Sequence, residues 1–434
     1  MNWFWLSLLL TFLIACGNDT GEIEVGTTEG YTALGYPDGR KIVRDSENNL
    51  YVAFRKKYSM DSEELHHIFV AKSTDQGQNW QITHNNTPIE RVGDYNQRVP
   101  AMAIDGHDTL HVVWYGNDAK NDDENERQIK YSRSSDGGDT WSDWINIADV
   151  DGYEDEDELW QEHPTLYVDG ENNLYVTWQG KDKKYSKSQV KFSMSTDGGN
   201  SWTSWINVSP SKKINYSRPT IITSHDGRIL YILAYSGSSA VQQIVWTKST
   251  DGGRSWTAWQ PVATDKQDQR HVSVAIDTQD RLHAVWRQQP GTAGGDTPSQ
   301  IRYAVYDGQS WSQPEWVGPN PSAYQVFPSI TVTGDNQVWV VWSESEIALD
   351  YPQENPGSGS IYYAVKSGDR WGNRIQLRED SQDIYPSLGR SWPGYRDQKD
   401  AYRNLGGSIA GRVDLVWLEN ADSDDNKIYY EPLN

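Results

Sequence analysis

Short stretches of alternating apolar and polar residues recur along the chain, and each is followed by a second stretch at a fixed distance. In the clearest case, residues 100–105 (Pro-Ala-Met-Ala-Ile-Asp) precede residues 110–114 (Leu-His-Val-Val-Trp). A period of two residues is typical of β-strands, and a short polar gap between two such runs is typical of a hairpin. The pattern predicts pairs of antiparallel strands, and no segment shows a convincing helical period.

The paired stretches share one frame, in which 14 residues separate the start of the first strand from an aromatic residue near the end of the second. Proline and tryptophan fill these two positions in 100–114, 164–178 and 328–342, and the same spacing relates 40 to 54 and 272 to 286. The spacing is 15 in 219–234 and 31 in 386–417, the latter through an insertion of 17 residues. The frame predicts seven strand pairs, beginning near residues 40, 100, 164, 219, 272, 328 and 386.

An eight-residue signature recurs in register with these pairs. Its four complete copies occupy residues 73–80, 134–141, 195–202 and 249–256, and each contains Ser, Asp, Gly and a closing Trp. Two shortened copies follow at 306–311 and 367–371, so that successive closing tryptophans are 61, 61, 54, 55 and 60 residues apart. A period of this size fits one four-stranded propeller blade with its loops.

The signature resembles the Asp-box, Ser-x-Asp-x-Gly-x-x-Trp, of the sialidase superfamily (BNR repeats). This resemblance implies an all-β fold, a β-propeller of four-stranded antiparallel blades in which each Asp-box forms an outer hairpin turn away from the substrate. The aspartate can accept hydrogen bonds from the next backbone amides, and the glycine supplies a positive φ. We therefore interpret Asp75 and its equivalents as structural. The seven strand pairs predict a seven-bladed propeller, and the six blades usual in sialidases are the alternative.

The last blade lacks sequence for a fourth strand. Residues 427–434 fit a third strand, and the chain has nothing after them to cover its edge. An uncovered sheet edge promotes association with other chains. We therefore expect the extended segment Glu22–Val25, ahead of the first blade, to complete the last one.

The first sixteen residues follow a different pattern. Residues 3–14 are largely apolar, too short to span a bilayer comfortably, and lead into Ala15 and Cys16, the only cysteine. This arrangement resembles a bacterial lipoprotein signal, although its first part has no Lys or Arg. It predicts a signal peptide at 1–15, lipidation of Cys16, a tether at 16–31 and a single propeller domain at 32–434. The protein is then exported and lipid-anchored to a bacterial membrane, on the outer membrane or cell surface of a Gram-negative cell.

Composition and charge limit the classes of partner that the protein can bind. The chain of 434 residues has 21 Trp, 25 Tyr and 36 Gly, which is ample material for sheets and turns. Its net charge of −22 argues against nucleic acid as a partner, because phosphate binding needs a basic face. We expect a monomer that requires no cofactor. Acidic segments 149–160 and 422–425 could bind calcium, although their spacing differs from the EF-hand and solvated loops are the alternative.

Candidate site residues come from the start of each inner strand, because these starts converge on one face around the axis of a propeller. One position before the aligned residues stand Gly39, Val99, His163, Arg218, His271, Phe327 and Tyr385; two positions before stand, among others, Arg98 and Arg270. Arginines can bind a carboxylate or sulfate in bidentate fashion, and histidine or tyrosine can transfer a proton. Simple loop caps exposed to solvent are the alternative for each residue.

The second blade carries the closest family match. Arg98-Val-Pro100, then Asp122 and Asp123, then the Asp-box at 134–141 resemble the arginine motif, acid/base aspartate and first Asp-box of sialidases. The resemblance implies that Arg98 binds a substrate carboxylate and that Asp122 or Asp123 transfers a proton, with Arg218 and Arg270 as further arginines. A solvated loop is the alternative for the two aspartates. Trp160 is a candidate stacking platform for a sugar.

Three functions follow from these observations. The first is a sialidase-like glycosidase that hydrolyses a terminal acidic sugar, which the family resemblance favours. The second is a seven-bladed polysaccharide lyase acting on uronates, with His163, His271 and Tyr385 for proton transfer and Arg218 for the carboxylate. The third is a non-catalytic surface propeller that binds a glycan or a protein.

Overall fold

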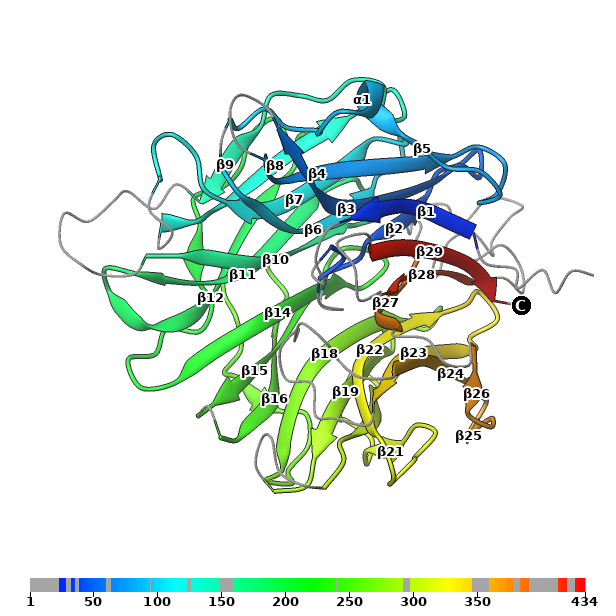
Figure 1. The fold of residues 1–434 in the computed structure, drawn as a ribbon. Coiled ribbons are helices and arrows are strands. Elements are labelled where there is room, and N and C mark those ends of the chain that lie inside the picture. Colours follow the sequence, from blue (N-terminus) through cyan, green and yellow to red (C-terminus); the bar gives the residue numbers. More distant parts are fainter. Residues whose placement is uncertain are drawn as a thin grey trace, which may run out of the picture.

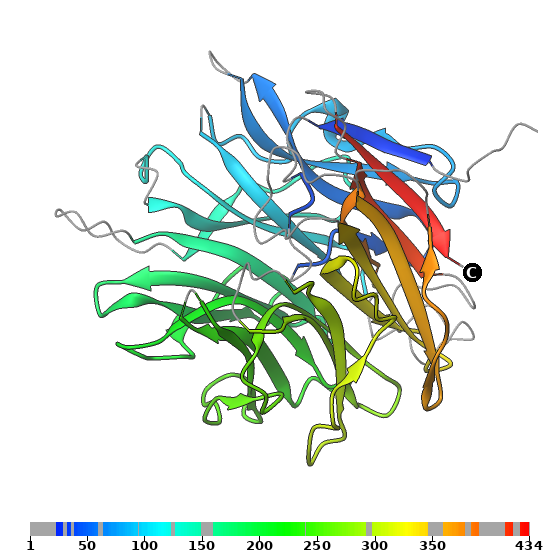
Figure 2. The same ribbon diagram turned by 60° about the horizontal axis from the view of Figure 1, so that its bottom comes forward.

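A computed structural model gives the structure of the protein and describes residues 23–28, 33–35, 39–59, 64–93, 95–122, 126–148, 159–238, 240–291, 297–345, 359–377, 383–389, 413–419 and 426–433. Seven antiparallel sheets radiate around one axis (Figures 1 and 2). The predicted all-β, seven-bladed β-propeller is confirmed, and the six-bladed alternative is wrong.

The first six blades each follow the sequence order of their strands. They are β2 (Ile42–Arg44), β3 (Leu50–Ser59), β4 (Glu64–Ser73) and β5 (Gln81–Ile82); β6 (Gln97–Ile104), β7 (Leu110–Gly116), β8 (Gln128–Ser134) and β9 (Ile145–Ala148); β10 (Gln161–Val168), β11 (Leu174–Asp182), β12 (Tyr185–Ser195) and β13 (Ile206–Asn207). They continue with β14 (Asn215–Thr223), β15 (Leu230–Gly237), β16 (Gln242–Ser249) and β17 (Gln260–Pro261); β18 (Asp268–Ile276), β19 (Leu282–Gln289), β20 (Gln300–Tyr306) and β21 (Glu315–Trp316); β22 (Tyr324–Val332), β23 (Val338–Ser345), β24 (Gly359–Ser367) and β25 (Arg370–Trp371), with β26 (Ile375–Gln376) also on β24.

The seventh blade joins the two ends of the described chain. Its sheet runs β27 (Asp383–Leu388), β28 (Val413–Glu419), β29 (Asn426–Leu433) and then β1 (Ile23–Thr28). Strand β1 pairs antiparallel with β29, Ile23 opposite Tyr430 and Thr28 opposite Asn426 (Figure 1). The prediction that a segment ahead of the first blade completes the last one is confirmed. This strand lies inside the range 16–31 assigned to the tether, so the propeller takes up part of it.

Tryptophans of the second strands fill the spaces between blades. The aligned Trp114, Trp178, Trp286, Trp342 and Trp417 are all fully buried. A large flat ring of this kind removes a great deal of apolar area from water where two twisted sheets face each other. The aligned aromatic position that defines the repeat is therefore the packing position that holds neighbouring blades together.

The Asp-boxes form the hairpin turns that the repeat predicts. In blade 2, Asp136 Oδ1 accepts hydrogen bonds from Ser134 Oγ at 2.7 Å and from the Thr140 amide at 2.9 Å. Ser134 Oγ in turn accepts a hydrogen bond from the Gly138 amide, and Trp141 Nε1 donates to the Gly138 carbonyl at 3.2 Å. The aspartate is thus fully engaged in closing its own turn, which confirms the structural interpretation.

Arg40 closes the propeller at its axis. Its guanidinium leaves blade 1 and donates to the carbonyls of Val274, Ile330 and Leu388 and to Ser329 Oγ, at distances of 2.5–3.3 Å. These acceptors belong to the first strands of blades 5, 6 and 7. One buried cation therefore ties four inner strands together, and the described centre is occupied by protein.

The only helical element among the described residues is a single turn, α1 (Thr83–Asn86). Within the same part of the chain, no helix is long and apolar enough to cross a bilayer. Cys16 and the expected signal peptide lie outside the described residues.

Candidate functional site

The residues predicted to face the ligand side share one unusual backbone conformation. The backbone φ is positive at five of these positions: 44° at Val99, 52° at His163, 47° at Arg218, 55° at His271 and 52° at Phe327. Each lies where the register of its inner strand shifts by a β-bulge against the second strand. A bulge redirects a side chain out of the ladder, and bulges are common beside active sites. A left-handed non-glycine residue costs about 1–2 kcal/mol, so five of them mark a feature that the fold maintains.

The same position in blade 1 is Gly39, and steric crowding explains the glycine. A Cβ atom there would lie 2.8 Å from the Cβ of Ala101 and 3.2 Å from Nζ of Lys41. Lys41 itself is buried and donates to the Pro100 carbonyl at 2.5 Å. The missing side chain in blade 1 leaves room for a lysine that contributes positive charge beside blade 2.

A basic cluster is formed by residues of blades 1 to 4. His163 packs against Tyr115 of β7, with ring centroids 5.3 Å apart. Both rings feel the positive charges of Arg98 and Arg218. Tyr115 also feels the charge of Arg55. His163 also feels the charges of Lys41 and Arg127. All three residues at the centre of the cluster are buried: Tyr115 and His163 are 6% exposed, and Arg218 is 8% exposed. We call these seven residues the basic cluster.

Burial and positive charge together set the protonation states in the basic cluster. Burial, reinforced by the neighbouring cations, lowers the pKa of His163 well below its ordinary value of 6.5. Burial raises the pKa of Tyr115, and the charge of Glu162 adds to this effect. At neutral pH the cluster therefore holds a neutral imidazole beside a protonated phenol, which are the protonation states of a general base and a general acid before reaction.

Glu162 offsets part of the positive charge. Its Oε1 accepts a hydrogen bond from Arg127 Nη2 at 2.6 Å, and its Oε2 lies 3.8 Å from His163 Nε2. Gln179 donates to Glu162 at 3.4 Å and accepts from the Arg218 amide at 2.8 Å, which links blades 3 and 4. Glu162 and Gln179 thereby orient Arg127 and the Arg218 backbone around the histidine.

A second group, in blade 5, contains the other predicted histidine. Asp268 Oδ2 accepts hydrogen bonds from Arg270 Nε and Arg287 Nη2, both at 2.9 Å. The rings of His271 and Phe327 lie 4.7 Å apart, centroid to centroid, and are tilted by 34°. Burial, followed by the charges of Arg287, Arg218 and Arg270, lowers the pKa of His271. Because Arg218 acts on both histidines, it links this group to the basic cluster.

The other predicted residues are placed differently. Asp122 is exposed in the β7–β8 loop, and among the described residues no hydrogen bond or ion pair joins it to the basic cluster. Trp160 lies just before β10, with Lys181 Nζ 5.5 Å from its ring centre. Tyr385 lies in β27, in line with the other inner-strand positions. Asp123 lies outside the described residues, as do the two acidic loops proposed for calcium, apart from Leu159 and Trp160. In the part of the chain that is described, no cluster of metal ligands is found.

The sequence reasoning missed several residues of these sites: Lys41, Arg55, Tyr115 and Arg127 in the basic cluster, and Asp268 and Arg287 in blade 5. Arg55, Tyr115 and Arg287 each directly follow the aligned aromatic residue of a second strand. Tyr115 pairs across the sheet with Arg98, and Arg287 pairs with Arg270. The position after the aligned aromatic residue is therefore the signal that could have found Arg55, Tyr115 and Arg287, since it lies opposite the inner-strand positions already selected.

The comparisons with known proteins agree with this architecture. The sequence model of the family described as BNR repeat-like domain matches residues 108–395, and no curated protein matches. An ulvan lyase of a polysaccharide lyase family is 13% identical, covering 93% of this chain and 94% of its own, with a TM-score of 0.62. A Dyadobacter fermentans protein of unknown function is 14% identical, with coverages of 80% and 98% and a TM-score of 0.52. A Trypanosoma rangeli sialidase is 12% identical, with coverages of 94% and 58% and a TM-score of 0.52.

At these identities the solved structures share the fold alone, whereas the family match covers more than half of the chain. The family expected from the repeats is confirmed: the chain belongs to the BNR repeat-like family, and its fold is a β-propeller.

Proposed function

We propose that the protein is a polysaccharide lyase that cleaves a uronate-containing glycan by β-elimination in the basic cluster. The observation that carries this proposal is the contact between His163 and Tyr115 within reach of the charges of Arg98 and Arg218. Elimination next to a carboxylate needs a base, an acid and a cation to neutralise the carboxylate, and these side chains supply all three.

The reaction assigns one role to each group. Arg98 and Arg218 neutralise the uronate carboxylate, which makes the proton on C5 more acidic. Neutral His163 takes this proton as the C4–O bond breaks and the C4–C5 double bond forms. Tyr115 donates its phenolic proton to the departing glycosidic oxygen, and solvent then exchanges protons between the two side chains. The products are an unsaturated uronate and a new chain end.

The comparison with lyases supports the same choice of substrate. The ulvan lyase that shares this fold is also described bound to a disaccharide repeat of glucuronate and 3-sulfated rhamnose. The experiment is a screen of the purified protein against ulvan and other uronate-rich polysaccharides and against sialosides. Absorbance from unsaturated uronate supports the lyase, and its absence across the panel contradicts it.

A sialidase-like hydrolase is the second candidate. The family match and the converging arginines fit a hydrolase as well as they fit a lyase. It would need Asp122 or Asp123 to reach the substrate held by Arg98. New reducing ends without unsaturated uronate, lost in Asp122→Asn or Asp123→Asn, would support it. If neither reducing ends nor unsaturated uronate form while the protein still binds a glycan or another protein, the result would support a non-catalytic propeller.

Export and anchoring belong to the same proposal. Signal cleavage before Cys16 and lipidation of its thiol would place the propeller on a bacterial membrane, where polysaccharides from outside the cell are met. The test is metabolic labelling with a fatty acid in the native host. Labelled membrane-bound protein that becomes unlabelled in Cys16→Ser supports the anchor, and equal labelling of the two contradicts it.

A further inference from the structure

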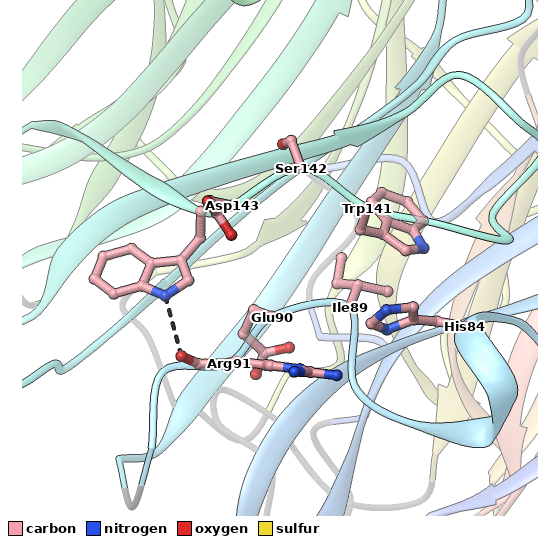
Figure 3. Close-up of a pocket in the computed structure, with 8 residues that line it drawn as sticks. His84, Ile89, Glu90, Arg91, Trp141, Ser142 and Asp143 are labelled. Atoms are coloured by element: carbon pink, nitrogen blue, oxygen red, sulfur yellow. Dashed lines mark hydrogen bonds between the residues drawn. The ribbon is translucent and has the colours of Figure 1, made fainter.

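A pocket of about 270 Å³ lies at the outer rim of the propeller, between blades 1 and 2 (Figure 3). Blade 1 contributes the segment that follows its outermost strand, and blade 2 contributes the end of its Asp-box hairpin. The lining residues are His84, Ile89, Glu90, Arg91, Trp141, Ser142, Asp143 and Trp144. None of these belongs to the basic cluster.

The blade 1 side of the pocket is built by an insertion. The Ile89 amide donates to the Ile68 carbonyl, and Ile89 comes nine residues after the Asp-box tryptophan of blade 1. In blades 3 to 6 the residue that makes the equivalent hydrogen bond comes only six residues after its tryptophan; these residues are Val208, Val262, Val317 and Leu377. The extra residues form α1, where His84, Asn85 and Asn86 have φ of 52°, 56° and 60°. Asparagine tolerates this conformation, but a left-handed histidine is strained. The His84 amide donates to the Gly138 carbonyl at 3.1 Å, which fixes the turn against blade 2.

A buried carboxyl group lines the pocket. Glu90 is 2% exposed; its Oε1 shares a hydrogen bond with His67 Nδ1 at 2.9 Å and accepts one from the Ile68 amide at 3.3 Å. Its other oxygen, Oε2, is buried and has no hydrogen-bond partner within the described structure. A buried polar atom without a partner costs about 1–3 kcal/mol. Because Oε2 is closed off from solvent, Glu90 shapes the wall of the pocket by holding His67 and the Ile68 amide in place.

Two half-buried indoles form the apolar part of the pocket. Trp144 Nε1 donates to the Arg91 carbonyl at 3.3 Å, the interaction drawn as a dashed line in Figure 3. Lys130 Nζ lies 4.4 Å from the ring centre of Trp144, and Trp141 Nε1 bonds the Gly138 carbonyl. Both rings are therefore held in place before any ligand arrives. Such rigid aromatic surfaces lose little entropy when a ligand packs on them.

The charges and size of the pocket limit its ligand. Arg91 and Asp143 are both exposed and of opposite sign, so the rim has no net charge to select an ion. The volume lies below the roughly 300–1,000 Å³ of sites for drug-sized ligands, so it suits a single ring. A pyranose ring has an apolar C–H face and several hydroxyl groups, which matches two indoles beside carboxyl oxygens.

We propose that this pocket binds one uncharged pyranose ring of a polysaccharide, independently of the basic cluster. The C–H face of the sugar packs on the indoles, while a hydroxyl group donates to the exposed carboxylate of Asp143 at the rim. The site goes beyond the proposed elimination: it holds a distant part of the polymer on the protein surface and takes no part in the chemistry.

The test is affinity electrophoresis of the purified protein in gels that contain ulvan or xylan, both of which contain uncharged pyranose rings. Trp144→Ala should weaken retardation by at least about tenfold in apparent affinity, and Asp143→Ala, an exposed change that leaves the core intact, should weaken it severalfold. The matched control is Trp205→Ala, because Trp205 occupies the equivalent place in blade 3, with Lys191 Nζ 4.2 Å from its ring centre, and the described residues of blade 2 contain no turn like α1. This control should be retarded like the unchanged protein.

Two results would overturn the proposal: no polysaccharide retards the unchanged protein, or Trp144→Ala and Asp143→Ala are retarded as strongly as Trp205→Ala. The outcome is separate from that of the proposed lyase. Retardation that depends on Trp144 without any elimination would refute the lyase alone, and elimination on short oligosaccharides with no retardation would refute the pocket alone.

Discussion

The rings of His163 and Tyr115 lie 5.3 Å apart, centroid to centroid, although the two residues come from different blades. His163 sits at a β-bulge of blade 3, and Tyr115 comes from the second strand of blade 2. Their contact therefore depends on the packing of neighbouring blades, and the arginines of blades 2 and 4 complete their surroundings.

Removing the Tyr115 hydroxyl should reduce elimination sharply while leaving the fold intact. Tyr115→Phe keeps the ring contact with His163 but loses the proton donor, and general acid catalysis contributes about 10²–10⁴-fold to rates. We expect kcat to fall within this range with little change in KM. Tyr131→Phe is the control: Tyr131 donates to or accepts from His111 Nδ1 at 2.7 Å in the same blade, so its loss should lower stability without this loss of rate. Equal rates for Tyr115→Phe and the unchanged protein would exclude Tyr115 as the acid.

The pKa of His163 should show itself in a titration. Its folded-state pKa is lowered, so between its ordinary value of 6.5 and that lower pKa the unfolded chain binds a proton that the folded chain does not. This part of the stability is fully present above pH 6.5 and is lost as pH falls through the window. NMR titration of the ring protons should give a midpoint below 6.5, and Arg218→Gln should raise it, because the Arg218 charge opposes protonation. A midpoint at or above 6.5 would contradict this account.

The Asp-box of blade 2 offers a matched pair of carboxylates. Asp136→Ala removes the acceptor for Ser134 Oγ and the Thr140 amide and should lower the free energy of unfolding by about 1–2 kcal/mol. Asp139→Ala, in the same turn, changes the charge equally but removes no described hydrogen bond and should stay within about 0.5 kcal/mol. Chemical denaturation measures both, and elimination by the folded variants should be unchanged. Equal stability losses in the two variants would mean that charge alone, rather than turn closure, matters.

Arg40 should be one of the most sensitive positions for stability. Arg40→Met keeps the aliphatic stem but leaves the carbonyls of Val274 and Ile330 without their donor at the axis, and each such loss costs about 1–3 kcal/mol. Thermal unfolding should show a large drop in melting temperature. Arg228→Met should show almost none, because this exposed arginine has, among the described residues, an ion pair only with Asp226 at 3.5 Å.

The repeats in the sequence were enough to predict the propeller, its seven blades and the strand that closes it, because each blade repeats the same spacing and the same buried aromatic residue. They were also enough to select His163, Arg218 and Arg98 as inner-strand residues of one face. The role of Tyr115 was hidden, since an aromatic residue beside Trp114 has the pattern of ordinary strand packing. The bulges were hidden too, because a left-handed φ at Val99 or Phe327 follows from the tertiary fold rather than from local preference. The rim pocket depends on a three-residue insertion, which the spacing reveals only once the equivalent backbone hydrogen bonds are known.

The most direct test of the central claim is the formation of unsaturated uronate by the unchanged protein and by His163→Gln, followed by absorbance on the same uronate-rich polysaccharide. Glutamine fills similar space but cannot act as the base, so we expect steady formation of product by the unchanged protein and a loss of at least about 10²-fold in the folded variant. Product formed at equal rates by both proteins, or reducing ends released without unsaturated uronate, would contradict the account.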